Sequence, residues 1–150
     1  MSKLKTKMEI KPKIGFENIK FGMYRKDIIN ILGEPDRITT DEYDEDEHRL
    51  DWNYLKIRLT FQADDRFTYF TCKNADLKYN GHNFFDMQIE KAKNEIFGKL
   101  AKEWEVEDYE FFQTHFNEKL WLTLRSEYGK VIEFELGVPF KSETEYNWPK

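Results

Sequence analysis

The residues best suited to chemistry in this chain are three histidines and one cysteine. His48, His82 and His115 lie 34 and 33 residues apart, whereas zinc sites in proteins use ligands at short paired spacings such as His-x-x-x-His. Cys72 lacks a nearby histidine in the sequence, and a thiol nucleophile needs a base and an orienting group. We therefore expect ordinary histidines, a small buried Cys72, no metal and no cofactor.

Other signatures of catalysis are missing from the sequence. It contains no phosphate-binding loop, dinucleotide fingerprint, G-x-S-x-G elbow or kinase motif set. Asp41, Tyr43 and Glu45 alternate as calcium ligands can, but the glycine of a calcium loop is absent. The sequence favours a non-catalytic protein; a small enzyme stays an open alternative that a polar cluster inside a pocket would revive.

The charge of the chain is concentrated in blocks. The net charge is −5, but residues 34–51 carry nine acidic residues against two arginines, and residues 103–118 carry six acidic residues with no lysine or arginine. An acidic surface repels phosphate backbones, so direct nucleic-acid binding is not expected. Residues 41–47 allow two interpretations. They form a solvated connection, or they imitate the phosphates that a basic protein partner binds.

Two pairs of segments alternate apolar and polar residues, as half-buried strands do. Leucines and isoleucine at 55, 57 and 59 match leucines at 120, 122 and 124, and the residues between them should face the opposite side of the sheet. Tryptophan and arginine are frequent in binding hot spots, although the C-terminal tail around Trp148 could instead cover Trp121. The candidate partner-binding residues are Asp44, Glu45, Asp46, Glu47, Asp51, Trp52, Arg58, Trp121 and Arg125.

The chain also contains two segments with the same sequence pattern, which indicates an internal repeat. Residues 21–32 superimpose on residues 85–96 after a shift of 64, with Phe21 on Phe85 and Met23 on Met87. We predict an α+β fold of two tandem repeats, each a helix or helical hairpin followed by antiparallel strands, forming one sheet with helices on one face. The predicted divisions are a basic tail or edge strand (1–13), a first repeat (14–76), a second repeat (77–140) and a C-terminal tail (141–150).

The first unit resembles a known family. Residues 19–35, IKFGMYRKDIINILGEP, resemble the opening of β-lactamase-inhibitor-protein-like repeats, which also occurs in outer-membrane assembly lipoproteins and many small bacterial toxin-immunity proteins. The second copy departs from the motif, because Asp86 replaces the glycine and no Gly-x-Pro follows. The resemblance implies protein binding through an open sheet face and transfers no catalytic residue.

Within that family, we expect an immunity protein that neutralises a cognate toxin. The immunity protein would cover the active site of a basic toxin domain. A nuclease is the toxin class that suits the acidic charge of this chain. The alternative is a scaffold or envelope-assembly module. The lysines at the N-terminus precede no apolar segment, and no apolar run reaches the roughly 20 residues that cross a bilayer. We therefore expect a cytoplasmic protein without a membrane partner.

Overall fold

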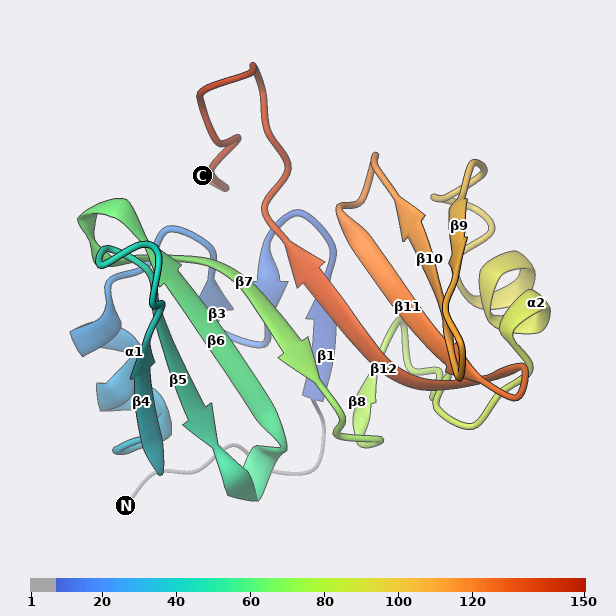
Figure 1. Ribbon diagram of the computed structural model, residues 1–150, viewed down its shortest axis with the longest axis horizontal. Helices are drawn as coiled ribbons and strands as arrows, with labels where there is room; N and C mark the ends of the chain where they lie inside the picture. The colour runs from blue at the N-terminus through green and yellow to red at the C-terminus, as the bar shows by residue number, and fades with distance from the viewer. Residues whose placement is uncertain (1–7) are drawn as a thin grey trace.

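The structure, a computed structural model, describes residues 8–150 as two β-sheets with short helices (Figure 1). The strands are β1 (Met8–Lys11), β2 (Gly15–Phe16), β3 (Ile19–Lys20), β4 (Arg37–Thr40), β5 (His48–Trp52), β6 (Ile57–Gln62), β7 (Arg66–Cys72), β8 (Leu77–Lys78), β9 (Glu105–Asp108), β10 (Gln113–Asn117), β11 (Leu122–Glu127) and β12 (Lys130–Gly137). The helical segments are α1 (Arg25–Leu32), α2 (Ile89–Lys91), the π-helical turn η3 (Ala92–Ile96) and the 3-10 turns η1 (Asn53–Leu55) and η2 (Ala63–Asp65).

The large sheet has eight antiparallel strands in the order β4-β5-β6-β7-β12-β11-β10-β9. It consists of two four-stranded meanders, β4–β7 and β9–β12, that join along β7 and β12. Phe70 of β7 lies opposite Leu136 of β12 at this junction. The small sheet has the order β3-β2-β1-β8, in which β1 runs antiparallel to β2 and parallel to β8.

Helix α1 forms where apolar residues recur four positions apart. Ile28 and Leu32 are buried, so one stripe of the helix faces the core. Gly33 ends the helix with φ 87°, a conformation that costs glycine little, and its N–H donates to the Ile29 carbonyl at 2.8 Å. This end of the helix is fixed to the sheet because Trp52 Nε1 donates to the Gly33 carbonyl at 2.9 Å.

The hydrophobic core lies on one side of the large sheet and is rich in phenylalanine. Phe16 of the small sheet contacts Phe70 of β7 with ring centroids 4.8 Å apart, and Phe70 in turn contacts Phe134 of β12 at 5.6 Å. Phe84 extends the same cluster to Phe134 at 5.4 Å. These aromatic contacts join the small sheet and both meanders into one core.

The predicted α+β fold class is wrong, because the protein is mostly β. The helix expected in the second repeat is short: α2 has three residues and passes into the five-residue turn η3. A Cβ on Gly98 would lie 2.0 Å from the Asn94 carbonyl oxygen, so the chain folds back tightly there. The small sheet was also missed, because its strands are short and Met8 pairs with the distant Leu77.

The predicted boundaries of the two repeats and the two tails remain predictions. Two observations concern the N-terminal range. Residues 8–11 of the expected basic tail or edge strand form β1, which lies between β2 and β8. Residues 1–7 lie outside the described part of the chain. Among residues 8–150, no helix has the length and apolar character needed to span a membrane.

Candidate functional site

The face of the large sheet opposite the core carries polar and aromatic side chains. Strand alternation sends Leu59, Phe70 and Phe134 into the core, and the residues between them point the other way. We call this second side the open face. The strand registers place one row of residues across it: Arg37, Asp51, Arg58, Thr71, Glu135, Thr123, Phe116 and Glu105.

Three of the predicted binding residues lie on the open face and form ion pairs there. Arg58 Nε donates to Asp51 Oδ1 at 2.7 Å and Arg58 Nη2 to Asp51 Oδ2 at 3.2 Å. This two-point contact with Asp51 raises the pKa of Arg58. Arg125 lies 3.7 Å from Glu133 and stacks over Phe112 at 3.8 Å. Beside Asp51 and Arg58, a hollow of about 340 Å³ opens toward Thr71 and Glu133.

The predicted assignment of Trp52 to the binding face needs correction. Its side chain is fully buried on the core side, together with Leu50 of the same strand. Adjacent strand residues point to opposite faces, so Asp51 and Trp52 cannot both lie on the open face. Trp52 therefore belongs to the core and holds the end of α1.

Trp121 lies at the open face but not within a strand. It has φ 55° in the turn before β11 and is half-buried. Its ring contacts Phe116 at 5.1 Å and Phe140 at 5.3 Å, both edge-on. Phe140 stacks on Tyr146 of the C-terminal tail at 4.6 Å. The tail thus reaches Trp121 through Phe140, and the Trp121 side chain stays half-buried rather than fully covered.

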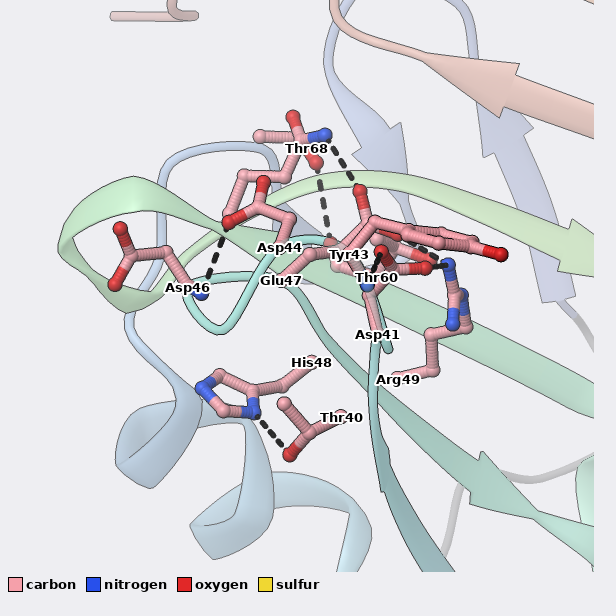
Figure 2. Close-up of polar contacts among 11 residues, drawn as sticks. Thr40, Asp41, Tyr43, Asp44, Asp46, Glu47, His48, Arg49, Thr60 and Thr68 are labelled. Carbon is pink, nitrogen blue, oxygen red and sulfur yellow. Dashed lines mark hydrogen bonds and ion pairs between the residues drawn. The ribbon is translucent and has the colours of Figure 1, made fainter.

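The acidic segment 41–47 connects β4 to β5 as a hydrogen-bonded loop (Figure 2). Asp41 Oδ2 accepts the Tyr43 N–H and Asp44 Oδ1 accepts the Asp46 N–H, each at 3.0 Å. These are Asx turns, in which a carboxylate stands in for a backbone acceptor. The Asp41 N–H donates to the Glu47 carbonyl at 2.9 Å and closes the loop.

Arg49 fixes both ends of this loop from the open face. Its Nη2 donates to Asp41 Oδ1 at 2.7 Å and also to Glu47. The hydrogen bond from Arg49 lowers the pKa of Asp41. Glu47 also accepts from Gln62 at 2.9 Å. The loop is therefore bound to its own strand, and its predicted binding residues Asp44, Glu45 and Asp46 remain exposed.

A buried polar chain, which sequence patterns did not indicate, lies beneath η3. Lys93 Nζ is 3.2 Å from His115 Nδ1, and His115 Nε2 is 3.0 Å from Ser126 Oγ. Lys93, His115 and Ser126 are 8%, 2% and 1% exposed. Burial is the main cause that lowers the pKa of His115. Because Ser126 is buried, a substrate cannot reach its hydroxyl group. We therefore interpret the hydrogen-bonded chain of Lys93, His115 and Ser126 as a structural network.

The cysteine and the two other histidines have surroundings that are common for these residue types. Cys72 is buried, and this burial raises the pKa of its thiol to about 12, which keeps it protonated and unreactive. Thr40 Oγ1 lies 3.0 Å from His48 Nδ1, a contact that is drawn in Figure 2, and His82 is exposed. Within residues 8–150, no group of three histidine, cysteine or acidic side chains is arranged to hold a metal ion.

Comparison with known proteins gives one structural likeness. No protein-family model matches the chain, and no curated protein matches it in sequence. A solved structure, described as an extracellular protein containing a SCP domain from Bacillus anthracis str. Ames, is similar with a TM-score of 0.51 at 12% identity. The match covers 77% of this chain and 43% of the other, so this chain spans less than half of that protein. At this identity the likeness concerns the fold alone.

Proposed function

We propose that this protein is a non-catalytic immunity protein, which binds a bacterial toxin domain and neutralises it by covering its active site. The observation that carries the proposal is the acidic loop beside the open face. Its exposed carboxylates stand on a segment that Arg49 and two Asx turns already hold in shape. A loop ordered before binding loses less entropy when the partner arrives.

The charge on this loop supports a basic partner. Asp44, Glu45 and Asp46 are exposed and form no ion pair among the described residues. Exposed carboxylates steer association with a positively charged surface and disfavour acidic partners. A toxin domain with a basic active-site cleft, of which nucleases are the type that fits best, has the complementary charge.

The open face supplies the second part of the contact surface. It presents Arg58, Arg125 and Trp121, residue types that dominate binding hot spots. Arg125 is already oriented by Phe112 and Glu133. A partner docked on this face and on the loop would bury an aromatic centre with a charged rim, the usual anatomy of a protein interface.

The test uses the C-terminal domain of the protein encoded directly upstream, since toxin and immunity genes are expected to be adjacent. We expect a stoichiometric complex and loss of toxicity on co-expression. The variant D44K/E45K/D46K should slow association at low salt by at least tenfold. The matched control E34K/E95K/E103K makes the same charge change at exposed residues outside the strands of the large sheet and should have a smaller effect.

Two results would contradict the proposal at different levels. A toxin domain that is not bound and stays toxic would overturn the immunity function, and a scaffold role would replace it. Equal association rates for the two triple variants would overturn the role of the loop. Glu47 is left unchanged in both variants because it pairs with Arg49 and Gln62, and its loss would alter the loop itself.

A further inference from the structure

Glu135 occupies the middle of the open face. It belongs to β12, one of the two central strands of the large sheet, and lies between Thr71 of β7 and Thr123 of β11. Its side chain reaches solvent, although the surrounding groups of the open face partly desolvate the carboxyl group. Both flanking residues are uncharged, so neither adjacent strand supplies Glu135 with a directly opposite cation.

The neighbouring charges of the open face are paired with other residues. Arg58 binds Asp51 through two hydrogen bonds. Lys73 and Arg125 lie 3.6 and 3.7 Å from Glu133, on either side of it. Among residues 8–150, Glu135 forms no ion pair. Partial burial of the carboxyl group and the nearby Glu133 raise the pKa of Glu135, while a hydrogen bond from the Thr71 side chain lowers it.

Aromatic rings adjoin this carboxylate along the same strand. Gly137 follows Glu135 by two positions, so both belong to the same face. A Cβ on Gly137 would meet Trp121 Cδ1 at 2.6 Å and the Tyr69 Cβ at 3.1 Å. Trp121 and Tyr69 therefore cover the space over Gly137, beside Glu135. The result is a carboxylate that has a hydrogen bond from Thr71 but no counterion among residues 8–150, next to half-buried rings.

This combination has the chemistry that recognises a guanidinium group. A guanidinium binds a carboxylate through two parallel hydrogen bonds and stacks on aromatic rings, whereas an ammonium is a more strongly hydrated point charge. We propose that Glu135 and Trp121 form the receptor for one arginine side chain on the surface of a protein partner. The proposal rests on the protein-binding role proposed above and names the partner residue that would enter the centre of the interface.

The receptor can be tested without the toxin by a short peptide. Acetyl-Gly-Arg-Gly-amide is titrated into the full chain, and the indole N–H of Trp121 is followed by NMR. We expect a saturable shift with the arginine peptide and a shift at least fivefold smaller when citrulline, which has the same shape without the charge, replaces arginine. The lysine peptide should bind more weakly than the arginine peptide; equal binding would overturn the assignment to arginine.

Substitutions locate the binding to Glu135. E135Q should weaken binding of the arginine peptide at least fivefold, whereas E34Q, which changes an exposed residue at the end of α1, should leave it unchanged. Thermal unfolding of E135Q should match or exceed that of the wild type, because the native carboxylate lacks a counterion, so a folding defect would not imitate the result. No shift at Trp121, or an equal shift in E135Q, would overturn the proposal.

The two proposals can fail independently. A toxin domain that is neutralised equally well by the wild type and E135Q, together with no peptide binding, would remove the arginine receptor and keep the immunity function. Peptide binding that depends on Glu135, together with an active toxin, would keep the receptor and remove the immunity function.

Discussion

The indole of Trp121 lies directly over Gly137. A Cβ at Gly137 would approach Trp121 Cδ1 to 2.6 Å and Nε1 to 3.3 Å. The Gly137 N–H also donates to the Trp121 carbonyl at 2.9 Å, so the two residues are joined by backbone as well as by the ring. The strand β12 therefore has no room for a side chain at this position while Trp121 occupies its place.

The substitution G137A should displace Trp121 and destabilise the protein by about 1–3 kcal/mol, the usual cost of an added group in a packed site. The measurement is urea unfolding together with the near-ultraviolet circular dichroism of the tryptophans. In the W121A background the cost of G137A should be smaller, because the clashing ring is gone. An equal cost in both backgrounds would show that the ring is not the obstacle.

The buried contact between Lys93 and His115 predicts a dependence of stability on pH. Burial and the adjacent Lys93 lower the pKa of His115, while Glu90 and Asp108 act in the opposite direction. The unfolded chain takes up a proton near the ordinary histidine pKa of about 6.5, but the folded chain does so only at a lower pH. The stability contributed by neutral His115 is therefore present above that value and decreases as pH falls toward the folded pKa.

The melting temperature should consequently fall between about pH 7.5 and about pH 5.5, and H115Q should show a smaller fall. Glutamine keeps a polar group beside Lys93 and Ser126 but does not titrate. The exposed His82 provides the control, since H82Q should retain the wild-type dependence on pH. If H115Q retained it as well, another group would be responsible.

The geometry around Arg49 predicts how the acidic loop responds when its hydrogen bonds are removed. In R49Q, the pKa of Asp41 should rise toward its ordinary value, because the hydrogen bond from Arg49 is the largest cause of its depression. The depressed pKa of Asp41 contributes stability that is fully present above the pKa of Asp41 in the unfolded chain. This contribution is lost as the pH falls through the pKa of Asp41 in the folded chain. The carboxyl titration of Asp41 is measured by NMR.

Amide exchange reports the shape of the same loop. The Tyr43 and Asp46 N–H groups donate to Asp41 and Asp44, and both should exchange faster in R49Q than in the wild type. R37Q alters an exposed arginine of the neighbouring β4 and should leave exchange and titration unchanged. Wild-type exchange rates in R49Q would mean that the Asx turns hold the loop without Arg49.

Alternation in the sequence predicted the centres of the main strands but not their first residues. Leu55 and Leu120, both expected within strands, lie instead in turns that precede β6 and β11. The residues after them, Lys56 and Trp121, have φ 52° and 55°. A leucine buried in a turn continues the apolar pattern of the strand, so the pattern alone cannot show where the turn ends.

The residues of the candidate site that follow from local sequence patterns were predicted, whereas those that depend on strand pairing were not. Alternation placed Arg58 and Arg125 on the open face, because it depends only on neighbouring residues. Glu135 was missed, since its position at the centre of the sheet follows from the pairing of β12 with β7. The contact between Lys93 and His115 likewise joins a π-helical turn to a strand 22 residues later, and no local pattern indicates it.

The C-terminal tail is attached to the sheet by a cation–π contact. The guanidinium carbon of Arg66 lies 4.1 Å from the centre of the Trp148 ring, and Arg66 Nε donates to the Gly22 carbonyl at 2.9 Å. Trp148 also contacts Tyr146 at 5.0 Å. One ring thus helps to orient an arginine that connects β7 to the turn after β3.

The substitution W148A should lower the free energy of unfolding by about 1–2 kcal/mol, as expected for a partly desolvated cation–π contact and its packing, and urea unfolding measures the change. W148F should keep part of the stability, because phenylalanine also has an aromatic face. Phe111 offers a comparison, since it is 68% exposed and F111A should change stability by no more than about 0.5 kcal/mol. Equal losses in W148A and F111A would mean that the tail is not held by Trp148. In that case its position over the sheet would depend on Phe140 and Tyr146 instead.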